Sequence, residues 1–239
     1  MAPKSLNSVV ESRNMSFQTG KTHGDFRTQE AFKTLRSNIQ FCGSEFRTIV
    51  FTSCIPNEGK SHVSYMTAAA FAELGKKVLF IDADLRKSVL RKRLHQTTRK
   101  TKGLSHFLSG QAALSEIVCP SETIENMSLV FTGPFPPNPA ELLSGEMFRL
   151  GLARLEEQFD YIFLDAPPVG SVIDAAIIAK ECDGVILVIA ANTVSYRLAQ
   201  SVKAQLDKTE CKILGTVLNK VDMKEHGYYG QYYGQYYGD

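Results

Sequence analysis

The sequence predicts an α/β fold in which a mostly parallel β-sheet is flanked by helices on both faces. Two observations lead to this prediction. Several short apolar runs are almost continuous, which suits strands that are covered on both faces. These runs alternate with helix-length segments, and such alternation is typical of βαβ units. The chain has 239 residues, which is enough for a single domain with one sizeable core.

A helix is expected first, over residues 28–41, because Phe32, Leu35 and Ile39 form an apolar stripe at helical spacing. Strands are expected at the short apolar runs, which are 47–53, 77–82, 128–132, 161–165, 184–190 and 212–219. Helix-length segments lie between several of these runs, at 61–75, 140–158, 171–180 and 194–208. Ligands bind at the carboxyl ends of the strands in such a sheet. We therefore expect the chemistry directly after residues 53, 82, 165 and 219.

Two segments without a core pattern flank the expected domain at 28–222. Residues 1–27 are polar and aperiodic, which indicates a flexible N-terminal segment. Residues 223–239 include GYYGQYYGQYYGD, which holds six of the nine tyrosines. Glycine and glutamine between the tyrosine pairs create no helical or strand-like apolar face. We expect this tail to be a flexible, exposed string of phenolic hydroxyls.

Composition and charge exclude several classes of protein. No apolar run approaches the roughly 18 residues of a membrane helix, and the N-terminus lacks a signal peptide, so we expect a cytoplasmic protein. The five cysteines have no CxxC or Cys/His spacing, which argues against a disulfide framework or a zinc site. A net charge of +2 does not indicate nucleic-acid binding. The basic run at 86–102 is typical of a solvated surface.

A phosphate-binding loop is predicted after the first strand. Its core, Gly59-Lys60-Ser61, leads directly into a helix. In such a loop main-chain N–H groups bind phosphates, the lysine reaches the β and γ oxygens, and the serine ligates Mg²⁺. The motif predicts a P-loop NTPase fold that binds a nucleotide together with Mg²⁺. The predicted nucleotide-binding residues of the loop are Pro56, Asn57, Glu58, Gly59, Lys60, Ser61 and His62.

Carboxylates end two other predicted strands. Asp82 and Asp84 follow the second strand, and Asp165 ends the run at 161–165. Carboxylate oxygens suit Mg²⁺ and its waters, and a carboxylate near the γ-phosphate can accept a proton from an attacking hydroxyl. A single aspartate at a strand end is an ordinary turn former. Three at strand ends indicate one site.

Together these motifs resemble the bacterial tyrosine kinases, in particular the Gram-positive cytoplasmic form that works beside capsule or exopolysaccharide synthesis. Residues 53–61 match the family pattern Ser-x-x-Pro-x-x-Gly-Lys-Ser, in which Cys54 stands where other P-loops have glycine. Residues 82–86 match Asp-x-Asp-x-Arg. Residues 165–168 match Asp-[Ser/Thr]-Pro-Pro, with Ala166 in place of the hydroxyl residue. The segment 136–143 and the tyrosine-rich tail also look like those of the family.

The resemblance implies an ATP-dependent protein-tyrosine kinase whose P-loop kinase domain is 28–222. Asp82 is then the general base, assisted by Lys60 and Asp84. The implied metal ligands are Ser61, Asp84 and Asp165, and Arg86 and Asn219 are further nucleotide-binding candidates. The implied acceptors are the tail tyrosines Tyr228, Tyr229, Tyr232, Tyr233, Tyr236 and Tyr237.

The family also implies partners. A homo-oligomer, in some members a ring, would form through Glu30, Lys33 and Arg36, which correspond to a Glu-x-x-Arg-x-x-Arg helix of the family. Lys33 replaces the first arginine of this motif, so it keeps the positive charge but lacks the bidentate fork of a guanidinium. A transmembrane adaptor with an activating cytoplasmic tail would recruit the chain to the inner face of the membrane, and a phosphotyrosine phosphatase would oppose the kinase. The resemblance also implies regulation of capsular or exopolysaccharide synthesis. A thirteen-residue tail can span tens of Å, so we expect phosphorylation in trans.

Three other classes share parts of this pattern. Septum-positioning and partition ATPases carry a signature lysine where this chain has Ile55. GTPases have an NKxD motif, which residues 219–222 match, but they have no counterpart of the Asp82 and Asp84 pair. A non-catalytic regulator that uses nucleotide only to assemble is the third class. A dinucleotide oxidoreductase is excluded, because no GxGxxG follows any strand.

Overall fold

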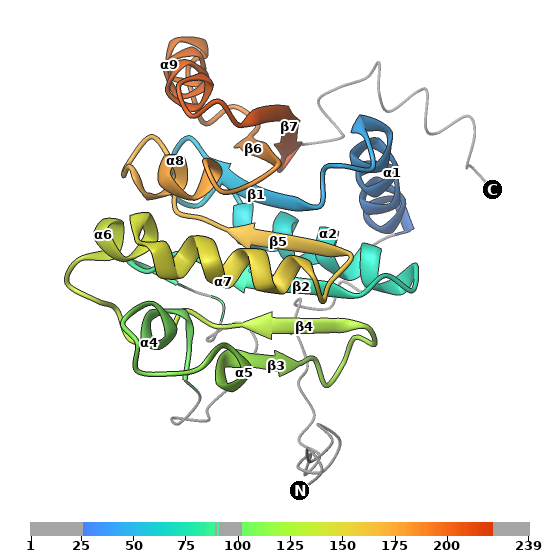
Figure 1. Ribbon diagram of the computed structural model, residues 1–239. Helices are drawn as coiled ribbons and strands as arrows, with labels where there is room; N and C mark the ends of the chain where they lie inside the picture. Colours follow the sequence, from blue (N-terminus) through green and yellow to red (C-terminus); the bar gives the residue numbers. More distant parts are fainter. Residues whose placement is uncertain (1–25, 89, 91–101, 222–239) are drawn as a thin grey trace, which may run out of the picture.

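A twisted β-sheet lies between two layers of helices (Figure 1). The computed structural model describes residues 26–88, 90 and 102–221. In this part of the chain the strands are β1 Thr48–Ser53, β2 Val78–Asp82, β3 Val118–Pro120, β4 Met127–Val130, β5 Tyr161–Asp165, β6 Gly184–Ala190 and β7 Lys212–Asn219. Their order in the sheet is β3-β4-β2-β5-β1-β6-β7. All neighbours are parallel except β3, which is antiparallel to β4, so the predicted α/β fold is confirmed.

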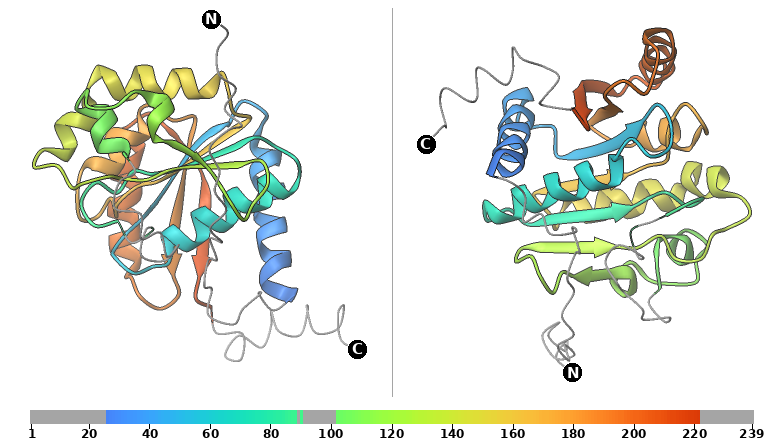
Figure 2. Two further views of the ribbon diagram at one scale, coloured as in Figure 1. Left: turned by 90° about the horizontal axis from the view of Figure 1, so that it is seen from below. Right: turned by 180° about the vertical axis from the view of Figure 1, so that it is seen from behind.

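Helices cover both faces of the sheet (Figures 1 and 2). One face carries α1 Phe26–Cys42 and α2 Lys60–Glu73. The other carries α4 Leu104–Leu108, α5 Leu114–Ile117, α6 Pro139–Ser144, α7 Glu146–Glu156, α8 Asp174–Ala179 and α9 Tyr196–Asp207. None of these helices is long and apolar enough to cross a membrane.

The core consists of two apolar layers, one on each face of the sheet. Strand β5 shows why its sequence reads as continuously apolar: Ile162 and Leu164 pack into one layer, and Phe163 packs into the other. Successive side chains of a strand point to opposite faces, so a strand covered on both sides needs apolar residues throughout. The Phe163 ring lies 5.1 Å from the Phe71 ring of α2, measured between centroids.

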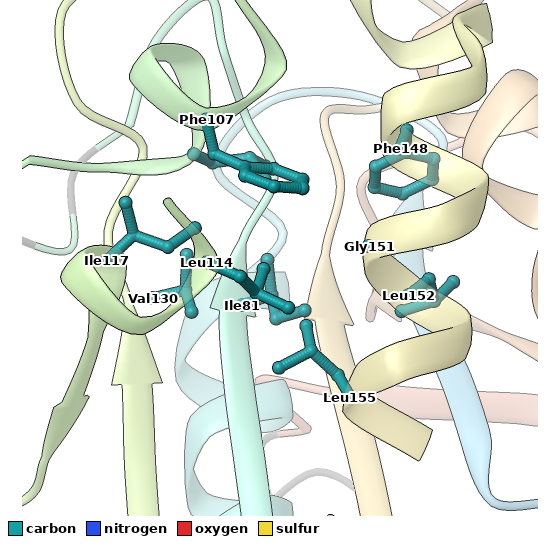
Figure 3. Close-up of a pocket in the computed structure, with 10 residues that line it drawn as sticks. Ile81, Phe107, Leu114, Ile117, Val130, Phe148, Gly151, Leu152 and Leu155 are labelled. Atoms are coloured by element: carbon teal, nitrogen blue, oxygen red, sulfur yellow. The ribbon is translucent and has the colours of Figure 1, made fainter. Parts of the chain in front are cut away.

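A small apolar cavity lies among α4, α5 and α7 above β2 and β4 (Figure 3). Its lining includes Phe107, Leu152 and Leu155 and none of the predicted site residues. Gly151 allows α7 to approach α4, because a Cβ there would lie 2.5 Å from Cε1 of Phe107. The cavity is a feature of the core and is separate from the phosphate loop.

Two sequence predictions about elements need correction. The expected single helix at 140–158 is two helices, α6 and α7, because Gly145 between them has an extended backbone with ψ of 157°. The short elements β3, α4 and α5 were not predicted. The runs at 161–165, 184–190 and 212–219 form strands with the predicted bounds.

Several predictions fall outside the described residues. These are the tail at 223–239 with its six tyrosines, almost all of the N-terminal segment 1–27, and most of the basic run at 86–102. Helix α1 begins at Phe26, two residues before the predicted start. The described part does contain the strand ends on which the site was predicted. Asp82 of β2 and Asp165 of β5 are register partners in adjacent strands.

Candidate active site

The phosphate loop connects β1 to α2 and contains two residues with left-handed backbone. Asn57 has φ of 68° and Gly59 has φ of 88°. Successive N–H groups in turns of this kind form concavities that bind anions. Gly59 is also needed for space, because a Cβ there would lie 2.1 Å from Nδ2 of Asn219. These two left-handed residues are consistent with a phosphate-binding loop.

Neighbouring elements hold this loop from outside. Glu58 is 1% exposed, and its carboxylate accepts the N–H groups of Ile55 at 2.9 Å and Ala190 at 3.0 Å. Nδ2 of Asn219 donates to the Glu58 carbonyl at 2.8 Å, and Nζ of Lys220 donates to the Asn57 carbonyl at 2.7 Å. The side chains of Glu58 and Asn219, both predicted as nucleotide contacts, thus fix the shape of the loop. Any contact of theirs with nucleotide stays a prediction.

Lys60 begins α2 and forms a buried ion pair. Its Nζ lies 2.5 Å from Oδ1 of Asp165, and the two side chains are 8% and 3% exposed. The Ser64 hydroxyl donates to the same oxygen at 3.3 Å, and Nζ of Lys60 lies 3.4 Å from Oγ of Ser61. Three predicted site residues, Lys60, Ser61 and Asp165, are thereby brought together.

Asp82 is buried at the end of β2, and its two carboxylate oxygens have different surroundings. Ser88 donates a short hydrogen bond to Oδ2. Oδ1 is buried and has no hydrogen-bond partner among the described residues. The nearby Thr132 hydroxyl donates to the main-chain oxygen of Asp82 at 3.0 Å. Burial, with a further contribution from the charge of Asp165, raises the pKa of Asp82 to about 7.

Asp84 and Arg86 lie in the turn that follows β2. Oδ1 of Asp84 accepts the N–H groups of Arg86 at 3.2 Å and Lys87 at 2.9 Å. The Arg86 guanidinium donates from Nε and Nη2 to both oxygens of Asp174, at 2.8 and 2.9 Å. The structure therefore places the Arg86 fork on α8. Any contact of Arg86 with nucleotide stays a prediction.

The carboxylates at this edge fit a magnesium–nucleotide complex. Among the described residues no group of three His, Cys, Asp or Glu side chains forms a complete metal site. Mg²⁺ in nucleotide sites commonly uses one or two protein ligands together with phosphate oxygens and waters, so a full cage is not required. The open Oδ1 of Asp82 provides a buried acceptor beside Asp165. Ser61, Asp84 and Asp165 are the residues that would hold the ion.

The predicted oligomer residues lie on α1. Nζ of Lys33 pairs with Glu30 at 2.6 Å within the helix. Nη1 of Arg36 donates to the Ala70 carbonyl of α2 at 2.9 Å. His62, a predicted loop contact, presents its ring edge-on to Phe32 of α1 at 6.0 Å between centroids. The contacts of Arg36 and Phe32 pack α1 on α2. A role for Glu30, Lys33 and Arg36 between subunits stays a prediction.

Sequence reasoning missed several residues of the site. Ser64, Ser88 and Asp174 each hydrogen-bond to a predicted site residue, yet none belongs to a recognisable motif. An aspartate at the start of an expected helix is ordinary at such a position, so Asp174 carried no signal. No disulfide joins the five cysteines, all of which lie in the described part of the chain.

The chain is similar to several known proteins. A family model described as an AAA domain matches residues 47–216. The tyrosine-protein kinase CpsD of Streptococcus agalactiae is 40% identical over 206 residues, which span 85% of this chain and 89% of that protein. The kinase domain of the Escherichia coli tyrosine kinase ETK has a TM-score of 0.80 at 28% identity and covers 90% of this chain and 84% of its own. The chimerical protein CapA2B2 has a TM-score of 0.76 at 32% identity, with coverages of 80% and 84%.

Proposed function

The chain belongs to the bacterial tyrosine kinases of the Gram-positive capsule type, and from this premise we propose that it phosphorylates its own C-terminal tyrosines in trans. It is a protein-tyrosine kinase with a P-loop fold that binds nucleotide, typically with Mg²⁺. The proposed acceptors are six tyrosines close to the C-terminus: Tyr228, Tyr229, Tyr232, Tyr233, Tyr236 and Tyr237.

The single observation that carries this proposal is the environment of Asp82. A general base works best when its pKa lies near the operating pH and when it can reach the proton that it removes. Burial raises the pKa of Asp82 to about 7, and its Oδ1 has no partner among the described residues. The carboxylate also lies beside Asp165, which pairs with the loop lysine. These features support Asp82 as the group that accepts a proton from a hydroxyl near the phosphates.

In the proposed reaction the acceptor phenol gives its proton to Asp82 as its oxygen attacks the γ-phosphorus of ATP. The bond from the γ-phosphorus to the β–γ bridging oxygen breaks, and ADP leaves. A free phenol has a pKa of about 10, so it needs a carboxylate partner or loses its proton late in a loose transition state. Asp82 then returns the proton to solvent.

Lys60 and the phosphate loop are proposed to bind the phosphates. The Lys60 ammonium lies 2.5 Å from Asp165, at the same strand ends as the other carboxylates, which supports a role on the β and γ oxygens. When bound, Mg²⁺ would neutralise negative charge on the phosphates. Ser61, Asp84 and Asp165 are proposed to hold this ion or its waters.

Transfer in trans follows from the length and chemistry of the tail. Its thirteen residues, if extended, can span tens of Å, enough to reach a neighbouring copy. Each phosphate would add a charge of about −1.5 to −2 at neutral pH. Several of them on adjacent subunits would repel one another, so we expect phosphorylation to favour disassembly of the oligomer.

Membrane recruitment and control of capsular or exopolysaccharide synthesis complete the proposal. Support comes from one relative: CapA2B2 is a chimerical protein, which suggests that such kinases work with a second protein. We propose a transmembrane adaptor as that partner and a phosphotyrosine phosphatase as the opposing enzyme.

Replacing all six tail tyrosines by phenylalanine tests the proposed acceptors. The full chain, incubated alone with Mg-ATP, is expected to gain phosphotyrosine within residues 227–239, and the variant is expected to lose most of it. Phosphopeptide mass spectrometry measures both. A synthetic tyrosine-containing peptide serves as the control, because the variant should still phosphorylate it at the wild-type rate. Unchanged phosphotyrosine per chain in the variant would place the acceptors elsewhere.

A further inference from the structure

One ion pair links the two strand ends that carry the acidic motifs. Arg86 lies in the turn after β2, and Asp174 is the first residue of α8, which follows β5. Nε and Nη2 of Arg86 donate to Oδ2 and Oδ1 of Asp174 at 2.8 and 2.9 Å. The pairing is bidentate, so it fixes the direction of the guanidinium as well as its distance.

The burial of this pair is uneven. The Asp174 side chain is 0% exposed, whereas that of Arg86 is 40% exposed. A fully buried carboxylate is costly unless it is paired and hydrogen-bonded. Both oxygens of Asp174 are used by the one guanidinium, so the pair holds the turn after β2 against α8.

The same turn holds Asp84. Its Oδ1 accepts the N–H groups of Arg86 at 3.2 Å and Lys87 at 2.9 Å, and Asp84 is 9% exposed. The Arg86 backbone is thus bonded to Asp84 while the Arg86 side chain is bonded to Asp174. A loss of the ion pair would release the two amide groups that fix the Asp84 carboxylate.

We propose that Asp174 is a positioning residue for the magnesium site: acting through Arg86, it fixes the turn that orients Asp84. The inference rests on the proposed function, in which Asp84 holds the metal or its waters. Residues that orient a metal ligand typically change metal affinity or activity by about 10–100-fold when they are mutated. Asp174 would act indirectly, because both of its carboxylate oxygens accept hydrogen bonds from Arg86.

Asp174→Asn in the full chain tests the proposal. ADP affinity is measured by titration calorimetry with and without Mg²⁺. The ADP affinity without Mg²⁺ is expected to match that of the wild type. The Mg²⁺ gain, which is the factor by which Mg²⁺ increases the ADP affinity, is expected to fall by about tenfold. In a peptide phosphorylation assay kcat should fall in the same range, with a smaller change in KM for ATP.

Two further variants separate positioning from simple packing. Arg86→Lys keeps the charge but loses the fork, so it should show the same selective loss, and the double variant should lose no more than Asp174→Asn alone. The matched control is Asp183→Asn at the other end of the sheet, where Asp183 accepts the N–H groups of Arg47 at 2.9 Å and Thr48 at 2.7 Å. This control should lower thermal stability and leave the Mg²⁺ gain unchanged.

Two results would overturn the proposal. If Asp174→Asn lowers thermal stability but leaves the Mg²⁺ gain intact, the ion pair is structural only. If it weakens ADP binding equally with and without Mg²⁺, it acts on the phosphate loop and leaves Asp84 unaffected. Neither readout depends on phosphotyrosine, so a wild-type chain that binds Mg-ADP but phosphorylates no tyrosine would reject the proposed function and leave the test of Asp174 valid.

Discussion

Lys60→Met is expected to abolish phosphotransfer and to destabilise the unliganded fold. The ammonium group is proposed to bind the β and γ oxygens, and loss of one preorganised group that stabilises the transition state costs on the order of 10²–10³-fold in rate. In the unliganded protein the same ammonium pairs with the buried Asp165 at 2.5 Å. Removing one partner of a buried pair typically costs about 3–5 kcal/mol in the free energy of unfolding. Phosphotyrosine yield and urea denaturation measure the two effects.

A second substitution separates the two roles of Lys60. In Lys60→Met with Asp165→Asn, no buried carboxylate is left without its cation at this position, so much of the lost stability should return. Phosphotransfer should stay absent, because the amide restores neither the phosphate contact nor the metal ligand. Residual kinase activity in Lys60→Met near the wild-type level would contradict the role of the loop. Equal stability of Lys60→Met and wild type would contradict the role of the ion pair.

Asp82→Asn is expected to make the protein less active and more stable. An amide cannot accept the phenolic proton, and loss of a general base typically costs about 10²–10⁴-fold in kcat. Burial and the charge of Asp165 raise the pKa of Asp82 to about 7, above its value in the unfolded chain. The ionised carboxylate therefore destabilises the fold. This penalty is absent below the unfolded pKa, increases as the pH rises, and is complete above the folded pKa.

The difference in unfolding free energy between Asp82→Asn and wild type should depend on pH in a known direction. In metal-free buffer the unfolding free energies of Asp82→Asn and wild type should be closest near pH 4 and should diverge up to about pH 8, with the variant more stable. Denaturant titrations across this range measure the difference. Phosphotyrosine yield at pH 8 measures the activity. A variant that keeps wild-type kcat, or one that is less stable than wild type at pH 8, would show that Asp82 does not play the proposed part.

The strand ends could be predicted from the sequence because a buried parallel strand has a plain local signature. The run at 161–165 is apolar up to Asp165, and this pattern marks both the strand and the edge at which it ends. Motif spacing then places Lys60 and Asp82 at the same edge, where the structure brings Asp82 and Asp165 into register. This part of the site depends on short stretches of chain.

The contacts that orient the site could not be predicted, because they join residues distant in sequence. Glu58 lies inside the predicted loop, but its carboxylate bonds to Ala190, 132 positions away. The fork of Arg86 rests on Asp174, 88 positions away. The break at Gly145 also escaped prediction, because the segments on both sides favour a helix and only the packing of α6 and α7 requires an extended residue between them.

Transfer between copies is tested most directly by a mixture of two complementary variants. One is Lys60→Met with its tail intact, and the other is the active chain without residues 227–239. Each is incubated with Mg-ATP alone and then mixed with the other, and tail phosphopeptides are quantified by mass spectrometry. We expect no tail phosphotyrosine in either separate sample. In the mixture we expect phosphotyrosine on the Lys60→Met tail, formed at a rate that rises with protein concentration. An unmodified Lys60→Met tail in the mixture, under conditions in which the wild-type chain modifies its own tail, would contradict transfer between copies.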